Sequence, residues 1–301
     1  MIHPVSARPR DDAGASGPTT GTDAPHGLEQ TLATKHARLT DLIASFDSLL
    51  IAFSGGVDSA FLAWVATRTL GPAALCVTAD SPSYPDRHRQ LAIRTARAFG
   101  FHHEIIRTAE LERPDYRSNP VNRCYYCKHE LYTTLTGIAR ERGMQVIADG
   151  SNADDRGDYR PGRQAARELG VRSPLDEAGL TKEEIRALSH DAGLPTWDEP
   201  ASACLSSRIP YFTEVTDEKL RMIERAEAVL RDLGFRICRV RHHDTIARLE
   251  LGRDEIARAL EPEVAARIDR ELRTIGYLHV TVDLRGYRLG SLNEALRLRP
   301  V

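Results

Sequence analysis

The sequence predicts an α/β fold with a doubly wound, mostly parallel sheet, followed by a smaller C-terminal α+β domain. Three observations lead to this prediction. Between residues 28 and 149, short apolar runs alternate with helical patterns, which is typical of strand–helix–strand units. A glycine-rich turn joins the first apolar run to a helical pattern, and this arrangement creates an anion-binding helix N-terminus. After Pro210 the order changes to helix, strand, strand, helix, strand.

These patterns divide the chain into three parts. Residues 1–28 are rich in Pro, Gly, Ala, Ser, Thr and Asp, with almost no large apolar side chains. Such a segment buries too little surface to offset the entropy of ordering, so we expect a disordered tail. The main domain is expected over residues 29–210 and the C-terminal domain over residues 211–301.

The main domain opens with a helical pattern at 28–45, which leads into an apolar run at 49–53. The later patterns predict, in order, a helix at 60–70, a strand at 74–79, a helix at 86–99, a strand at 102–106, a helix at 128–142 and a strand at 145–149. Gly71, Gly100 and Gly143 follow the three later helices, and glycine commonly ends a helix.

Thr181 and Glu184 have the spacing of a capping box, which predicts a helix that begins there and ends near His190. In the C-terminal part, the patterns predict helices at 217–233 and 261–275 and strands at 236–241, 246–251 and 279–284. The first two strands alternate like a hairpin, and we expect an antiparallel sheet.

The hexapeptide Ser-Gly-Gly-Val-Asp-Ser forms the turn between the first strand and the helix that follows it. Free backbone N–H groups and the helix dipole favour a phosphate there. Gly55 and Gly56 allow the backbone to approach an anion closely and to adopt positive φ. Ser54 and Ser59 can add hydroxyl donors, and Asp58 can orient Mg²⁺ or cap the helix. The lysine and the spacing of a Walker A loop are missing, and an ordinary tight turn is the alternative.

Two further loops are expected beside this hexapeptide. Residues 79–81 and 149–152 lie at the ends of two other predicted strands. Ligands of such sheets bind outside the carboxyl ends of the strands, so one nucleotide can contact all three loops. Plain turn chemistry is the alternative for the two later loops.

The chain has five cysteines, and an odd number argues against a disulfide framework. Cys76 and Cys238 lie in apolar runs and are expected to be small buried side chains. Cys124 and Cys127 form a C-x₂-C pair just before a predicted helix, and Cys204 follows much later in the chain. Three thiolates suit a [4Fe–4S] cluster that keeps one iron open.

Spacing alone leaves other uses of these three cysteines open. Direct thiol chemistry by Cys204 needs no cluster. A Zn²⁺ site prefers four protein ligands, and His129, the candidate for the fourth, fits a solvated helix start better. A redox C-x₂-C pair is a further alternative.

Composition narrows the class of protein. A net charge of −2 over 301 residues argues against a dominant basic surface for long nucleic acids. No apolar run approaches the ~20 residues that span a bilayer, and the N-terminus lacks the apolar region of a secretory signal. We therefore expect a cytoplasmic protein without a membrane partner.

Four segments together resemble the LarE family of PP-loop ATP pyrophosphatases, whose fold is adenine nucleotide alpha hydrolase-like. They are SGGVDS, NPVNRCYYCKHELY, EPASACLSSRIPY and CRVRHHDTIARLEL. SGGVDS marks only the superfamily, whereas the segments around Cys124 and Cys204 are the specific ones. The resemblance runs from about residue 30 to the C-terminus.

The resemblance implies an ATP-dependent sulfurtransferase of nickel-pincer nucleotide cofactor biosynthesis. Such an enzyme adenylylates a carboxylate of pyridinium-3,5-biscarboxylic acid mononucleotide, releases pyrophosphate, and converts the carboxylate to a thiocarboxylate. ATP and Mg²⁺ would bind at Ser54, Gly55, Gly56, Asp58 and Ser59. The family also suggests assembly into a homo-oligomer.

The family has two chemical forms. In one, the cysteine that matches Cys204 gives up its own sulfur and is left as dehydroalanine. In the other, three cysteines hold a [4Fe–4S] cluster whose open iron carries an extra sulfide. Because the chain has Cys124 and Cys127 as well, it resembles the cluster form.

Several residues are candidates for holding the substrate. Arg208, Arg239 and Arg241 can bind its phosphate and carboxylates in bidentate fashion, with ordinary surface charge as the alternative. Arg239 and Arg241 are two residues apart on a predicted strand and share one face. Glu250 is a candidate partner for them or for a metal. The pair at 125–126 consists of two tyrosines, which can stack on a pyridinium ring or pack in the core.

Three rival functions differ in what they require. A PP-loop tRNA thiolation enzyme with an iron–sulfur cluster would need an RNA surface, but no basic tract with interleaved aromatics is visible. An amide-forming synthetase of the NAD or GMP type has no use for these cysteines. A non-enzymatic nucleotide-binding scaffold would not need Asp58.

Overall fold

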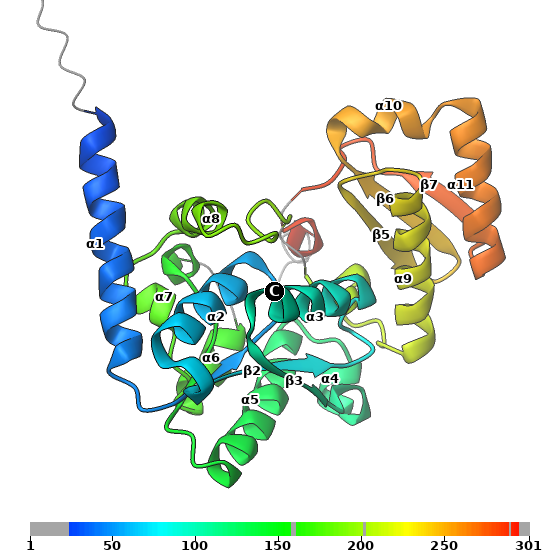
Figure 1. The fold of residues 1–301 in the computed structure, drawn as a ribbon. Coiled ribbons are helices and arrows are strands. Elements are labelled where there is room, and N and C mark those ends of the chain that lie inside the picture. Colours follow the sequence, from blue (N-terminus) through cyan, green and yellow to red (C-terminus); the bar gives the residue numbers. More distant parts are fainter. Residues whose placement is uncertain (1–23, 158–160, 201–202, 289, 295–301) are drawn as a thin grey trace, which may run out of the picture.

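The computed structural model describes residues 24–157, 161–200, 203–288 and 290–294. Of the expected tail at 1–28, residues 1–23 lie outside the described residues. The predicted fold class is confirmed: a parallel sheet with helices on both faces is followed by a smaller sheet with its own helices (Figure 1). The division at residue 210 stays a prediction.

The central sheet has four parallel strands in the order β3-β2-β1-β4. The strands are β1 (Leu49–Ala52), β2 (Ala74–Asp80), β3 (His102–Arg107) and β4 (Val146–Ala148). The helices of this part are α1 (Ala24–Ala44), α2 (Val57–Leu70), α3 (Asp86–Phe99), α4 (Pro114–Arg117), α5 (Arg123–Glu141), α6 (Pro161–Glu168), α7 (Pro174–Glu177) and α8 (Lys182–Asp191). The carboxyl ends of all four strands therefore point to one edge of the sheet.

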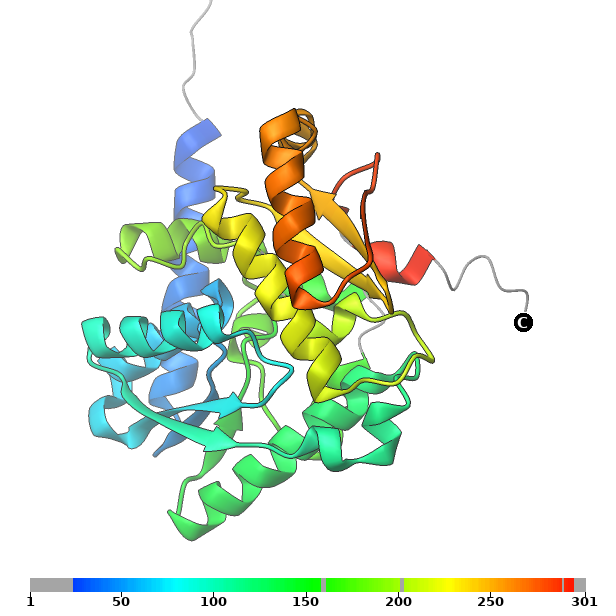
Figure 2. The ribbon, with the colours of Figure 1, turned by 90° about the vertical axis from the view of Figure 1, so that its right-hand side faces the viewer.

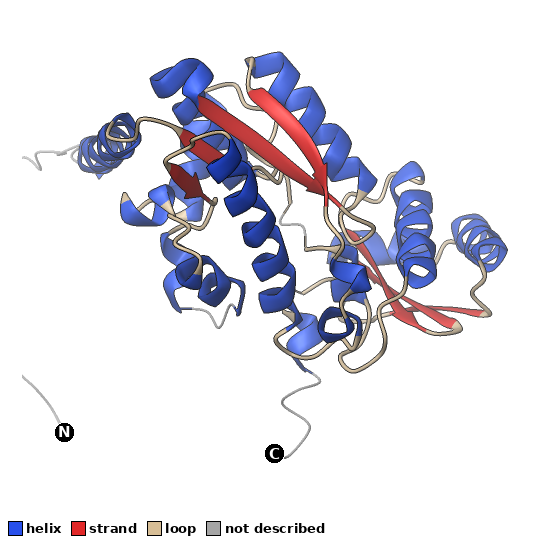
Figure 3. Ribbon diagram, turned by 90° about the horizontal axis from the view of Figure 1, so that it is seen from below, coloured by secondary structure: helices blue, strands red, loops and turns tan. Residues whose placement is uncertain are grey.

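Alternate residues of β1 belong to two different cores. Leu49 and Ile51 pack in a cluster with residues of α1, α2, α3 and α8. Leu50 and Ala52 pack in a second cluster with residues of α5 and α6. Because successive side chains of a strand point to opposite faces, these helices cover the sheet from both sides (Figure 3). This double burial explains why β1 is a continuous apolar run.

Local signals predicted α3 and α8 well. α3 runs from Asp86 to Phe99, and Gly100 ends it with φ of 69° in the left-handed region. The predicted capping box is confirmed, since the Thr181 hydroxyl accepts from the backbone N–H of Glu184 and the Glu184 carboxylate accepts from the N–H of Thr181.

The start of α5 differs from the prediction. The helix begins at Arg123, so Cys124 and Cys127 lie within its first turns and not before it. Residues such as Cys, Tyr and His have weak helix propensity, which places the predicted start too late. Burial of Arg123 and its hydrogen bonds outweigh this weak propensity.

The C-terminal part has its own sheet and core. It contains α9 (Asp217–Asp232), β5 (Cys238–His243), β6 (Ile246–Leu251), α10 (Ile256–Ala259), α11 (Pro262–Ile275) and β7 (His279–Val282). Figure 2 shows α9 and α11 side by side against the strands, and their apolar residues form one cluster with those of the sheet. β5 and β6 form the predicted antiparallel hairpin.

The prediction of a fully antiparallel sheet is wrong at the last strand. β6 and β7 pair in parallel, so the sheet is mixed. Two helices, α10 and α11, separate these strands in the chain. A helical crossover of this kind returns the chain to the starting end of the sheet, which makes the next strand parallel.

Candidate active site

The hexapeptide at 54–59 lies at the carboxyl end of β1 and leads directly into α2. Gly55 has φ of +66°, and a Cβ there would lie 2.7 Å from the Cβ of Ala92 in α3, so only glycine fits. Gly56 has φ of −78°, which does not match the positive φ expected for it. Ser59 Oγ lies 3.1 Å from Ser54 Oγ and donates to the Gly56 carbonyl at 3.2 Å. These contacts hold the turn in shape.

Asp58 lies in the first turn of α2 and contacts two residues from distant parts of the chain. Its Oδ1 accepts from Asn152 Nδ2 at 3.3 Å, and its Oδ2 forms an ion pair with Lys182 Nζ. The loop after β4 is pressed against the same turn, because a Cβ on Gly150 would lie 2.9 Å from the backbone nitrogen of Ser59. Two of the three predicted loops therefore meet at the helix N-terminus.

The loop after β2 links this turn to the segment that carries Cys204. Tyr84 Oη donates to the Ser54 carbonyl at 2.8 Å. The Ser83 carbonyl accepts from the backbone N–H of Leu205 at 2.8 Å. The residue after Cys204 is thus tied to a loop that itself contacts the hexapeptide, although more than a hundred residues separate the two segments in sequence.

The three candidate cysteines gather around the start of α5. Arg123, which precedes Cys124, places its Nη2 4.0 Å from Cys204 Sγ. Partial desolvation and the nearby charge of Cys204 raise the pKa of the Cys124 thiol, although Cys124 as a residue is exposed. Burial, Glu110 and Cys204 likewise raise the pKa of the Cys127 thiol. The three cysteines therefore lie in the same region of the molecule.

The donor types fit a soft metal centre, since thiolate sulfur is a ligand that such metals prefer and the Arg123 guanidinium beside Cys204 can offset negative charge. In the described part of the chain, no group of three or more His, Cys, Asp or Glu side chains has an arrangement ready to hold a metal ion. The sulfurs would have to move closer to share a single centre.

The other two cysteines lie in the cores. Burial raises the pKa of Cys76 to about 12. Burial and the charge of Glu227 raise the pKa of Cys238 to about 11. Both thiols stay protonated near neutral pH, as expected for small buried side chains.

Arg208 is 1% exposed and bonds entirely within the protein. Its Nε donates to Glu227 Oε1 at 2.8 Å, and its Nη1 donates to the carbonyls of Ala203 at 2.7 Å and Cys204 at 2.9 Å. The pair Arg208–Glu227 thereby anchors the Cys204 segment to α9. These donors of Arg208 are thus engaged within the protein, and its binding of the substrate's phosphate or carboxylates stays a prediction.

Arg239 and Arg241 lie two residues apart on β5, as predicted. Arg241 Nη2 pairs with Glu250 at 2.8 Å, and its Nη1 donates to the Ser207 carbonyl at 2.6 Å. The Arg239 guanidinium lies 5.3 Å from the ring centroid of Tyr287. Burial and the charge of Arg208 lower the pKa of Arg239. The Arg208 and Arg239 guanidinium groups are therefore close enough to repel each other, and Glu227 offsets part of this repulsion.

The tyrosine pair after Cys124 makes contacts within the protein. Tyr125 Oη donates to Glu168 at 2.6 Å, and its ring lies edge-on to Tyr126 with centroids 5.5 Å apart. Tyr126 also packs against the cluster formed by α4, α9 and the segment after Cys204. These contacts agree with the alternative that the two tyrosines pack within the protein and do not stack on a pyridinium ring.

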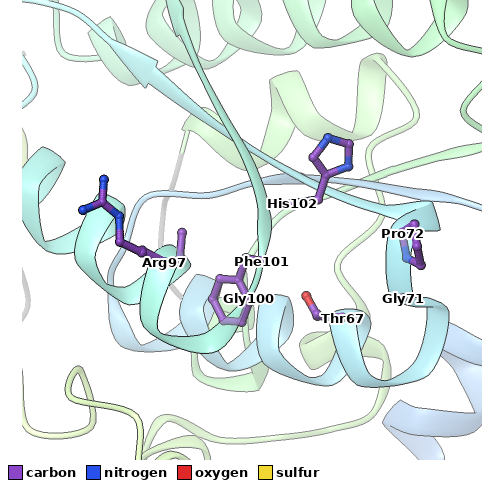
Figure 4. Close-up of a pocket in the computed structure, with 8 residues that line it drawn as sticks. Thr67, Gly71, Pro72, Arg97, Gly100, Phe101 and His102 are labelled. Atoms are coloured by element: carbon purple, nitrogen blue, oxygen red, sulfur yellow. The ribbon is translucent and has the colours of Figure 1, made fainter.

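A cavity of about 500 Å³ lies far from these groups along α2 (Figure 4). It is lined by Thr67 and Gly71 at the end of α2 and by His102 at the start of β3. This is the amino end of the sheet, opposite the edge that carries the hexapeptide. The cavity therefore belongs to neither the turn nor the thiols.

Known proteins resemble this chain along most of its length, although no protein-family model matches it. An uncharacterised protein of Synechocystis is 44% identical over 265 residues, which are 88% of this chain and 99% of that protein. The pyridinium-3,5-bisthiocarboxylic acid mononucleotide synthase of Lactiplantibacillus plantarum is 36% identical over 267 residues, which are 88% of this chain and 96% of the synthase. The chain belongs to the LarE family.

Membership in the LarE family covers both halves of the chain, because 267 matched residues exceed the length of either predicted domain. The chain is homologous to an enzyme. An uncharacterised protein of Methanocaldococcus jannaschii is a more distant relative, 26% identical over 240 residues, which are 80% of this chain and 90% of that protein. None of the described helices combines the length and the apolar character needed to cross a bilayer.

Sequence reasoning missed three residues of this candidate site. Lys182 was visible only as the first residue of the capped helix α8, yet it contacts Asp58. Asn152 was visible only as a loop residue. Arg123 preceded the C-x₂-C pair, and this adjacency was the one signal that could have identified it.

Proposed function

We propose that this LarE protein is an ATP-dependent sulfurtransferase. It adenylylates a carboxylate of pyridinium-3,5-biscarboxylic acid mononucleotide and converts it to a thiocarboxylate for the nickel-pincer nucleotide cofactor. The similarity to a pyridinium-3,5-bisthiocarboxylic acid mononucleotide synthase supports the substrate. The observation that carries the chemistry is the link from the hexapeptide through Tyr84 and Ser83 to the Cys204 segment.

The first step takes place at the N-terminus of α2. Free N–H groups of the turn, with the hydroxyls of Ser54 and Ser59, bind the ATP phosphates, and Lys182 adds a positive charge beside them. A substrate carboxylate oxygen attacks the α-phosphate, the bond to the bridging oxygen breaks, and pyrophosphate leaves. Asp58 is the candidate ligand for Mg²⁺, which when bound neutralises phosphate charge.

The second step replaces the adenylate by sulfur. In the sacrificial route, the Cys204 thiolate attacks the acyl carbon and AMP leaves with the bonding electron pair. Loss of the Cys204 α-proton then breaks the Cβ–S bond, which releases the thiocarboxylate and leaves dehydroalanine. In the cluster route, Cys124, Cys127 and Cys204 would hold a [4Fe–4S] cluster, which would supply the sulfur in place of Cys204.

The arginines position substrate and site. The donors of Arg208 and Arg241 already hold the Cys204 segment and Glu250, so both act mainly by fixing that segment. Arg239 is half-buried against the Tyr287 ring and is the candidate to face the substrate phosphate. The substrate would then lie between a main domain at 29–210 and a C-terminal domain at 211–301.

A turnover assay tests this function. Purified protein with ATP, Mg²⁺ and the dicarboxylate nucleotide should release pyrophosphate and AMP, and mass spectrometry should detect sulfur in the product. Absence of pyrophosphate with this substrate would refute the assignment. Pyrophosphate release with tRNA instead would favour a tRNA thiolation enzyme. A cytoplasmic location and homo-oligomeric assembly stay predictions.

A further inference from the structure

Arg123 is a buried cation in the first turn of α5. Its side chain belongs to a residue only 3% exposed. Nη1 donates to Asn119 Oδ1 and to the Ser206 carbonyl at 3.0 Å, and Nη2 lies 4.0 Å from Cys204 Sγ. Across residues 24–157, 161–200, 203–288 and 290–294, no carboxylate forms an ion pair with it.

The other buried arginines of the described chain do have carboxylate partners. Arg208, 1% exposed, pairs with Glu227. Arg241, 7% exposed, pairs with Glu250. Removing a charge from water is costly unless an opposite charge compensates it, and these two arginines follow that rule. Arg123 lacks such a carboxylate, so another group must supply the negative charge.

The largest electrostatic influences on Arg123 come from Cys204, Cys124, Tyr116 and Tyr211. Phenols ordinarily ionise near pH 10 and are neutral at physiological pH. The Tyr116 ring lies 6.0 Å from the guanidinium and its hydroxyl bonds to Ser206, so it contributes a polarisable face and no full charge. The sulfur atoms of Cys204 and Cys124 remain, and thiols become negatively charged when a bound metal ion displaces their protons.

We propose that Arg123 is a positioning residue that supplies the counter-charge for an anionic centre held by Cys124, Cys127 and Cys204. The proposal rests on the proposed function, because it takes the three thiolates as one sulfur site. Three thiolates exceed the charge of a divalent metal by one, and a single guanidinium balances that excess. The bond from Nη1 to the Ser206 carbonyl also fixes the segment that presents Cys204.

Arginine suits this position better than lysine for a geometric reason. Its planar fork directs one nitrogen to the Ser206 carbonyl and another toward Cys204 at the same time. Lysine can restore the positive charge, but its single nitrogen cannot reproduce both contacts in this geometry. The pair of substitutions Arg123→Gln and Arg123→Lys therefore separates the charge from the hydrogen bonds.

The test uses Co²⁺ alone as the probe, added anaerobically to the full-length, metal-free protein. Thiolate coordination gives a sulfur-to-cobalt charge-transfer band, which reports binding without catalysis. R123Q should bind Co²⁺ at least about tenfold more weakly than the unsubstituted protein, the size expected when a charge-assisted contact is lost. R123K should keep most of the affinity. The control is Arg140→Gln, an exposed position on the same helix, which should bind as tightly as the unsubstituted protein.

The outcomes separate this inference from the proposed function. Equal Co²⁺ affinity in R123Q and the unsubstituted protein would overturn the inference while leaving the sulfur site intact. No charge-transfer band in the unsubstituted protein would refute the three-thiolate site, and the inference with it. Thermal unfolding of the metal-free variants shows whether each variant still folds. If R123Q unfolds, the R123K variant decides between the two roles of Arg123. Tight Co²⁺ binding by R123K supports the counter-charge. Loss of Co²⁺ binding in a folded R123K variant assigns Arg123 a packing role.

Discussion

The carbonyl oxygen of Ser83 accepts a 2.8 Å hydrogen bond from the backbone N–H of Leu205. Ser83 belongs to the loop after β2, and Leu205 is the residue after Cys204. The neighbouring Tyr84 bonds to Ser54, so the anion-binding turn and the cysteine segment share one support.

The hexapeptide turn should not tolerate a side chain at Gly55. Gly55→Ala adds a Cβ that lies 2.7 Å from Ala92 Cβ and also strains a φ of +66°. Gly100→Ala is the matched control, because Gly100 has φ of +69° and nothing within 4 Å of the added Cβ. We expect G55A to weaken ATP binding by more than about tenfold, whereas G100A costs only about 1 kcal/mol of stability. Calorimetric titration measures the affinity for ATP, and denaturant unfolding measures the stability of each variant. Equal losses of ATP affinity in G55A and G100A would contradict the clash at Gly55.

Lys182 should contribute to ATP binding through its position beside Asp58. Lys182→Ala removes the positive charge that contacts this carboxylate at the start of α2. We expect KM for ATP to rise about tenfold, as for loss of one charge-assisted contact.

Asp58→Asn should instead lower the rate of pyrophosphate release, because it removes a candidate Mg²⁺ ligand and keeps the shape of the side chain. The control for Lys182→Ala is Lys219→Ala, which lies in the C-terminal part. An identical rise in KM for ATP in Lys219→Ala would contradict the role of Lys182 in ATP binding.

The three thiols of the sulfur site should be required for iron. Anaerobically reconstituted protein should hold roughly four irons per chain, and replacing Cys124, Cys127 or Cys204 by Ala should remove them. Cys76→Ala is the control, since Cys76 is fully buried in the main core and should retain the iron. Iron analysis and visible absorbance measure this. Colourless unsubstituted protein that forms product and loses H₂S from Cys204, seen by mass spectrometry, would establish the sacrificial route.

The buried pair Arg208–Glu227 should stabilise the fold in a pH-dependent way. Burial alone would raise the pKa of Glu227, but the charge and hydrogen bonds of Arg208 outweigh burial and lower it. A lowered pKa gives stability that is present above the unfolded-state pKa and is lost as pH falls through the folded-state value. Glu227→Gln should therefore cost about 3–5 kcal/mol at pH 7 and less in acid. Urea unfolding at both pH values checks this, and a pH-independent loss would disprove the ionic contribution.

The sequence alone determined the features that depend on residues close together in the chain. The capping box of Thr181 and Glu184, the extent of α3 and the turn at Gly55 each follow from hydrogen bonds or backbone angles within a few residues. The alternation of strands and helices predicted the parallel sheet, because a helix between two strands returns the chain to the starting end of the sheet. The resemblance carried by the segments around Cys124 and Cys204 agrees with the family that the comparisons show.

Only the tertiary structure decided which distant residues meet. Arg123 with Cys204, Lys182 with Asp58 and Arg208 with Glu227 are contacts that no local pattern encodes. The parallel pairing of β6 with β7 likewise depends on the path of two intervening helices. Such contacts follow from the packing of whole elements, because the free energy of burying a charge depends on every group around it and not on its neighbours in sequence.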